Sequence, residues 1–176
     1  MNNDLSATQA IRLRRSIRRY RTDVGVTDEQ LHLLLEAAMM APSACNSRPW
    51  EFIVVRSRPV LDMLAVVHPY AGMLKTAPLA IVVCALPDTQ GGISEGYYPQ
   101  DCGAATQNIL VQATAIGLGT CWCGVYPRMD RSPELCRILG IPEDAPQVPF
   151  NIIAVGVPDG IPPAHGFYDP AKVRFL

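Results

Sequence analysis

The fold of this chain is decided by one apolar run, Leu79-Ala80-Ile81-Val82-Val83-Cys84-Ala85. Its length and its isoleucine and valine content are typical of a β-strand, and an uninterrupted apolar run predicts a strand covered on both faces. Even extended to Leu86, the run is far shorter than the roughly 20 residues of a membrane-spanning helix. We therefore expect a buried strand in a globular protein that does not enter a membrane.

Helices and further strands are expected around this run in irregular alternation. Capping boxes at Ser6/Gln9 and Thr27/Gln30 predict two helices near the N-terminus. The expected helices cover residues 6–16, 27–42, 57–67, 101–116 and 132–140, and the expected strands cover residues 50–56, 79–85, 119–125 and 150–157. Because no run of regular βαβ units is present, the pattern favours an α+β layered sandwich.

The helix expected over residues 101–116 has an unusual distribution of side chains. Small and apolar residues surround much of its circumference, among them Ala104, Ala105, Ile109 and Ala113. Such a weakly amphipathic helix has no face suited to solvent. We therefore expect it to lie centrally or at a subunit interface.

Composition indicates one ordinary globular domain spanning residues 1–176. Of the 176 residues, 49% are hydrophobic and 18% are charged, and the net charge is -1. This balance provides no overall positive field that would recruit nucleic acid. Seven of the 16 prolines fall between residues 142 and 170, which predicts an extended C-terminal arm over about residues 158–176.

The six cysteines and three histidines show no pattern typical of a disulfide framework or a metal site. No two cysteines are spaced C-x-x-C, and the close pair Cys121 and Cys123 has no histidine nearby in the sequence. The N-terminus lacks a secretory apolar segment. We therefore expect free and mostly buried thiols, no metal, and a reducing cytoplasm as the compartment.

Charge is concentrated in residues 12–21, which contain six arginines and no acidic residue. A solvated helix face, a nucleic-acid arm and a targeting segment are the ordinary interpretations of such a run. However, Arg14, Arg15, Ser16 and Arg18 follow a capped helix, where guanidinium groups and a hydroxyl could surround a phosphate. The run is therefore a candidate anion site.

Two shorter motifs suggest other chemistry. Gly117-Leu118-Gly119 begins like a dinucleotide fingerprint, but a helix precedes it and a strand follows it, which is the reverse of the required order. Gly92-Ile93-Ser94-Glu95-Gly96 fits the G-x-S-x-G motif, and Asp159 and His165 follow in the order of a hydrolase triad. Several residues separate Ser94 from its strand and its helix, whereas a nucleophile elbow is a sharp turn between them. A Ser94 hydrolase remains as a rival hypothesis.

Five blocks in order resemble the nitroreductase family of FMN-dependent flavoproteins. The first two are Arg14-Arg15-Ser16-Ile17-Arg18-Arg19-Tyr20 and Pro42-Ser43-Ala44-Cys45-Asn46-Ser47-Arg48-Pro49-Trp50. The later blocks are Ala104 to Asn108, Gly117 to Trp122 and Val148 to Gly156. The resemblance implies an α+β fold, a three-layer α/β/α sandwich with a mostly antiparallel sheet and a long central helix. It also implies a homodimer with FMN pockets built from both subunits.

The resemblance assigns FMN contacts to the arginine run and to the C-terminal arm. Arg14, Arg15 and Ser16 would hold the FMN phosphate. Arg18 would approach the N1/O2 edge of the flavin, where reduction places negative charge that a fixed cation stabilises. The late phosphate ligands of the family correspond to Lys172 and Arg174.

The remaining implied contacts surround the flavin ring. The partner chain would line the ring with four loop residues, Pro42, Ser43, Ala44 and Asn46. For Ser43 and Asn46, simple loop capping is the alternative interpretation. The backbone near Cys123 and Gly124 resembles the segment that meets flavin N5.

This resemblance implies an enzyme that passes hydride from NADH or NADPH through FMN, by a ping-pong mechanism, to a nitroaromatic, quinone or similar small acceptor. The flavin would perform the chemistry, so no catalytic side chain is demanded beyond Arg18 as an electrostatic stabiliser. A non-catalytic FMN carrier or sensor is the alternative from another functional class.

Overall fold

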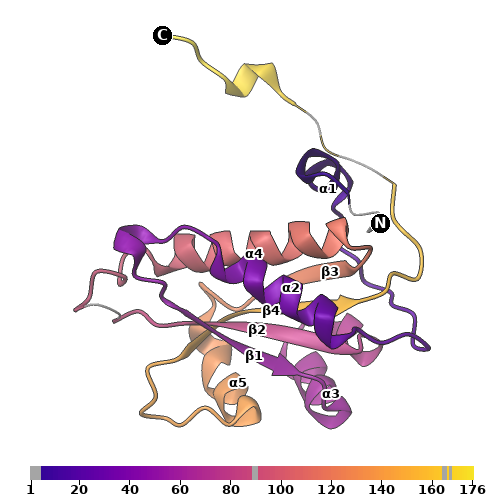
Figure 1. Ribbon diagram of the computed structural model, residues 1–176. Helices are drawn as coiled ribbons and strands as arrows, with labels where there is room; N and C mark the ends of the chain where they lie inside the picture. The colour runs from indigo at the N-terminus through magenta and orange to yellow at the C-terminus, as the bar shows by residue number, and fades with distance from the viewer. Residues whose placement is uncertain (1–4, 89–90, 164–165, 167) are drawn as a thin grey trace.

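The computed structural model describes residues 5–88, 91–163, 166 and 168–176, and its centre is a four-stranded antiparallel sheet (Figure 1). The strands are β1 (Trp50–Val55), β2 (Leu79–Ala85), β3 (Gly119–Gly124) and β4 (Val148–Gly156), in the spatial order β1-β2-β4-β3. All seven residues of β2 are buried, as the apolar run predicts.

Helices cover both faces of the sheet. The helices α2 (Asp28–Met39) and α4 (Tyr98–Ala115) lie on one face, and α3 (Arg58–Val67) and α5 (Ser132–Leu139) lie on the other (Figure 1). Alternate residues of β2 enter different cores: Ile81 and Val83 pack on the α2/α4 side, whereas Val82 and Cys84 pack on the α3/α5 side. The expected three-layer α/β/α sandwich of the α+β class is confirmed.

The long helix α4 begins three residues earlier than its sequence pattern predicts. Pro99 lies in its first turn, where a missing backbone N–H costs nothing, so the helix starts within the expected loop. Its residues Ala105, Ile109 and Ala113 are fully buried against the sheet. The short helix α1 (Ala7–Leu13) crosses its C-terminal end, where Leu5 N donates to Ala115 O at 3.2 Å.

Two element boundaries differ from expectation for local reasons. Helix α1 ends at Leu13 because the following residues leave it to lie beside β3, where Ile17 N donates to Thr120 O at 2.8 Å. Strand β4 starts at Val148 and includes Pro149, which pairs with Cys84 at a register shift. A proline is tolerated at such an irregularity because it removes no regular ladder bond.

The described residues also form four short 3₁₀ helices that the sequence pattern did not predict. They are η1 (Ala44–Asn46), η2 (Gly72–Lys75), η3 (Met129–Arg131) and η4 (Pro170–Lys172). Each is too short to carry a helical periodicity in the sequence.

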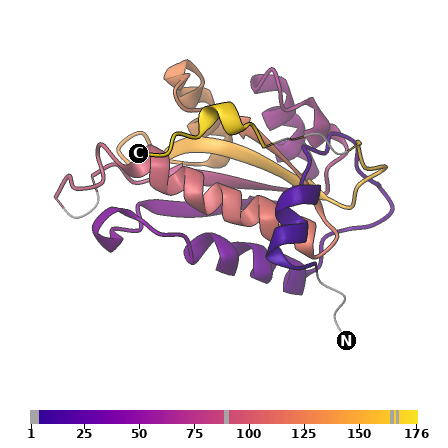
Figure 2. The same ribbon diagram turned by 90° about the horizontal axis from the view of Figure 1, so that it is seen from above.

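After β4 the chain leaves the sheet and carries η4 away from the body of the molecule (Figures 1 and 2). Large hydrophobic side chains are exposed along the described part of this arm: Ile161, Tyr168, Val173, Phe175 and Leu176. None of the described helices has the length and apolar character needed to cross a bilayer.

Gly119 allows the arginine run to approach β3 closely. A Cβ atom at Gly119 would lie 2.6 Å from Ile17 Cγ1 and 2.9 Å from Pro158 Cγ. We expect Gly119→Ala to lower the free energy of unfolding by about 1–2 kcal/mol, because the added methyl group overpacks this contact. Denaturant unfolding measures the change, and Gly25→Ala is the control, since a Cβ there meets nothing within 4 Å. Equal stability of the two variants would contradict the prediction.

Candidate functional site

A cavity of about 360 Å³ opens beside the arginine run. Ser16 to Arg19 form one wall, and residues 159–162 form the other. The walls are held by the bond from Ile17 to β3 and by a bridge between Tyr20 and Pro158. Ser16 and Arg18, two of the predicted FMN ligands, therefore line the same space.

The Arg14 and Arg15 side chains have different surroundings. The Arg15 guanidinium donates to three backbone carbonyls, those of Arg12 at 3.0 Å, Arg14 at 2.5 Å and Pro163 at 3.2 Å. Arg15 thus ties the start of the C-terminal arm to the end of α1. Arg14 is the half-buried C-cap of α1, two residues before Ser16, and is not among the residues that line the cavity. A phosphate role for Arg15 stays a prediction, and it would require some of these bonds to be exchanged.

Arg18 lies close enough to β3 to influence its thiols. Cys121 and Cys123 are buried on the same face of the strand. The neighbouring Cys123 thiol and the positive charge of Arg18 lower the pKa of the Cys121 thiol, although burial opposes the shift. Arg18 is exposed and lines the cavity, and its charge acts on a thiol of the neighbouring strand.

The Cys123 side chain points into the core. Its Sγ lies 3.4 Å from Tyr70 O and 3.8 Å from Met73 Sδ. The thiol is consequently occupied by protein contacts. A contact between the flavin and the backbone near Cys123 and Gly124 stays a prediction.

Gly124 presents its backbone at the open edge of β3. Val125 N donates to Phe150 O on β4, and Ile17 N reaches Thr120 O from the opposite side. The backbone N–H and C=O groups of successive residues point to alternate sides of a strand. In β3, the N–H and C=O groups of the even-numbered residues therefore point away from β4. The N–H of the exposed Gly124 therefore faces outward, where a ligand can accept its hydrogen bond.

The loop that contains Pro42, Ser43, Ala44 and Asn46 is braced internally. Ser43 Oγ accepts from Arg48 N at 2.9 Å, and Asn46 Oδ1 accepts from Arg48 Nε at 3.1 Å. Both side chains thus perform the loop capping considered as their alternative role. Left-handed backbone occurs at Cys45, Asn46 and Arg48, with φ of 50°, 55° and 49°.

Asp101 anchors this loop to the first turn of α4. Its carboxylate is 6% exposed and accepts from Ala44 N at 3.2 and 3.3 Å. The sequence contains no local signal for this contact, because 57 residues separate the partners. Asp101 offsets part of the cost of the left-handed residues, about 1–2 kcal/mol each.

The two groups of predicted FMN contacts lie at opposite ends of α4 (Figures 1 and 2). The loop meets α4 at Asp101, whereas α1 and the arginine run adjoin its end near Ala115. An 18-residue helix is about 27 Å long. One chain therefore does not bring both groups into one pocket.

Lys172 and Arg174 are exposed on the arm, within and just after η4. Neither lines the cavity at Ser16 and Arg18. Within one chain, the structure does not join them to the predicted phosphate ligands.

Ser94 has the surroundings of a structural residue. It is fully buried, and its hydroxyl donates to Pro87 O at 2.7 Å and to Leu86 O at 3.1 Å. A nucleophile must reach a substrate, which this burial prevents. Asp159 lines the arginine cavity instead, and His165 lies outside the described residues.

Comparison with known proteins identifies the family to which the chain belongs. Residues 11–65 and 62–157 match the model of the nitroreductase family. The chain belongs to the nitroreductase family. It is 43% identical to a protein of Methanothermobacter thermautotrophicus provisionally named NADH dehydrogenase/NAD(P)H nitroreductase, over 97% of this chain and 86% of the relative.

Solved structures of nitroreductases share the whole fold. An FMN-dependent nitroreductase of Clostridium difficile superposes with a TM-score of 0.84 at 33% identity, covering 94% of this chain and 96% of the other. A provisionally named nitroreductase of Desulfovibrio desulfuricans, solved in complex with FMN, superposes with a TM-score of 0.83 at 32% identity, covering 98% of both chains. The family resemblance seen in the five sequence blocks is thereby confirmed.

Proposed function

We propose that this protein is an FMN-dependent oxidoreductase that transfers electrons from NADH or NADPH to a nitroaromatic, quinone or similar small acceptor. The observation that carries the proposal is the cavity beside the arginine run, where Ser16 and Arg18 line the same space. An oxidoreductase function is also supported by family membership and by the FMN named for two similar structures.

The residues around the cavity fit FMN chemically. Arg14 and Ser16 supply a cation and a hydroxyl for the phosphate, and Arg18 supplies positive charge for the electron-rich edge of the ring. The outward N–H of Gly124 offers a hydrogen bond to the ring itself. We further propose that Arg15, Lys172 and Arg174 complete the phosphate site in the assembled protein.

When bound, FMN supplies the two-electron chemistry and exchanges electrons with nicotinamide and acceptor in turn. The chain would position the cofactor and provide positive charge through Arg18. The thiols at the Cys121 and Cys123 positions are buried, so they are not available as nucleophiles. All six cysteines are unpaired, which supports a reducing compartment such as the cytoplasm.

Purified protein should be yellow and contain non-covalent FMN. Anaerobic addition of NADH or NADPH should bleach the flavin spectrum, and an acceptor should restore it. Steady-state kinetics should then be ping-pong, since donor and acceptor use the same face in turn. A colourless protein that takes up no added FMN would remove the proposal. FMN that binds but is not reduced by either nucleotide would instead favour a carrier or sensor.

We also propose that two chains form a dimer and share two flavin pockets. Each chain carries Pro42, Ser43, Ala44 and Asn46 at one end of α4 and the arginine run at the other, so a two-fold partner can unite the two groups. The exposed apolar side chains of the arm support the same assembly, because they lack cover within one chain.

Light scattering should therefore report twice the mass of one chain. Deleting the arm after Pro158 should reduce both the dimer fraction and the FMN content. A stable full-length monomer with complete FMN occupancy would contradict a shared pocket.

A further inference from the structure

His68 is a buried side chain that the proposed mechanism leaves without a role. It is 1% exposed and caps the C-terminal end of α3. Its Nδ1 accepts a hydrogen bond from Tyr70 N at 3.3 Å, and its Nε2 lies 2.8 Å from Gly124 O. Because Nδ1 is an acceptor, the proton of the neutral ring is on Nε2, which donates to Gly124.

The hydrogen bond with His68 takes the place of an inter-strand hydrogen bond to the Gly124 carbonyl, which β3 lacks on its outer side. The Gly124 carbonyl points away from β4, so the sheet does not hold it. Gly124 also has no side chain whose packing could hold it. The N–H and C=O of one strand residue point to the same side, so a fixed carbonyl keeps the Gly124 N–H directed outward.

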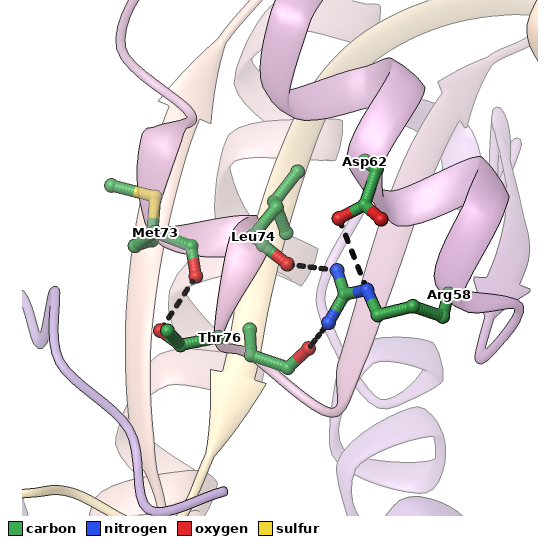
Figure 3. A network of polar contacts seen from close by, with 6 residues as sticks. Arg58, Asp62, Met73, Leu74 and Thr76 are labelled. Atoms are coloured by element: carbon green, nitrogen blue, oxygen red, sulfur yellow. Dashed lines mark hydrogen bonds and ion pairs between the residues drawn. The ribbon is translucent and has the colours of Figure 1, made fainter.

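The turn that carries His68 is itself firmly attached. Arg58, at the start of α3, forms an ion pair with Asp62 at 3.1 Å and donates to the backbone carbonyls of Leu74 and Ala77, as Figure 3 shows. Between these points, Ala71 N donates to His68 O at 3.0 Å. The imidazole therefore joins the end of β3 to a braced helix and turn.

We infer that His68 is a positioning residue for the flavin: through the Gly124 carbonyl it keeps the Gly124 N–H aimed at the ring. This inference rests on the proposed FMN site at the edge of β3. It assigns the imidazole an effect on cofactor binding without direct contact between His68 and the cofactor.

Three variants separate the two hydrogen bonds of the ring. In His68→Gln the amide nitrogen can replace Nε2 and donate to Gly124, whereas in His68→Asn the amide oxygen can replace Nδ1 and accept from Tyr70. His68→Phe retains the ring volume and loses both bonds. The thermal midpoint of each variant reports general damage to the fold.

The first measurement is FMN affinity, followed by fluorescence and by the visible circular dichroism of the bound flavin. We expect His68→Asn and His68→Phe to bind FMN about three- to tenfold more weakly, the fold-change of one neutral hydrogen bond. The dichroism of their bound flavin should change, because the ring is held differently. His68→Gln should restore both properties.

The second measurement does not depend on FMN. Val125 N belongs to the same peptide group as Gly124 O, so its hydrogen exchange should be faster in the Asn and Phe variants and unchanged in the Gln variant. Altered exchange with unchanged FMN affinity would overturn the positioning role and leave the proposed function intact. Equal FMN affinity in the Gln and Asn variants would also overturn it. If the wild-type protein binds no FMN, the proposed function fails, and the inference fails with it.

Discussion

Replacing Arg18 by alanine is expected to slow flavin reduction by roughly ten- to a thousandfold, comparable to the loss of one oxyanion-hole donor. The guanidinium supplies positive charge where negative charge accumulates as the ring accepts electrons. That stabilisation is needed more in the reduced state than in the oxidised state, so the rate should fall more than FMN affinity does. Stopped-flow absorbance under anaerobic conditions measures the effect directly.

Arg18→Lys and Ser94→Ala are the matched controls for this experiment. Lysine retains the charge without the planar fork, so part of the rate should return. Ser94 is buried and bonded to backbone carbonyls, so its loss should leave the rate of flavin reduction nearly unchanged, although stability can fall. Normal flavin reduction in Arg18→Ala would overturn the proposed role of Arg18, and loss of flavin reduction in a folded Ser94→Ala variant would contradict the structural role of Ser94.

Replacing Arg14 by alanine is expected to weaken FMN binding by about 1.5–3 kcal/mol, the usual contribution of a hydrogen bond to a charged group. This corresponds to roughly a tenfold to 150-fold rise in the dissociation constant. Arg14 is half-buried, so water screens its interaction less than that of a fully exposed arginine. Fluorescence titration of the FMN-free protein gives the constant.

Arg21→Ala is the control for charge alone. Arg21 belongs to the same basic run but is paired with Asp23 at 2.6 Å. Its removal should change FMN affinity much less than the loss of Arg14. Unchanged affinity in Arg14→Ala would place the phosphate site elsewhere, and equal losses in both variants would indicate a diffuse effect of the basic run.

Local pattern was sufficient for most of the secondary structure. The apolar run at residues 79–85 is β2 in full, and the boxes at Ser6/Gln9 and Thr27/Gln30 cap α1 and α2. These features depend on neighbours within a few residues, so their physical causes are visible in the sequence. The early start of α4 and the proline in β4 were missed, because each depends on the local tolerance of a missing N–H.

The candidate site, like the secondary structure, could be predicted from the sequence only in part. The chemical type of the ligand could be predicted from the arginine run, because guanidinium groups bind phosphate well whatever their exact placement. The position of Gly124 at an open strand edge follows only from the strand order, in which β3 has a single neighbour in the sheet. Likewise, the separation of the loop from the arginine run depends on the length and position of α4.

Two residues show most clearly what required the tertiary structure. Asp101 meets Ala44 across 57 positions, and His68 meets Gly124 across 56 positions. In the sequence, one is an acid in a helix and the other is one of three scattered histidines. Contacts between distant residues arise only when the sheet and its helices pack together, so periodicity and motif spacing contain no trace of them. The elements and the chemical type of the ligand thus follow from local sequence, and the geometry of the site follows from packing.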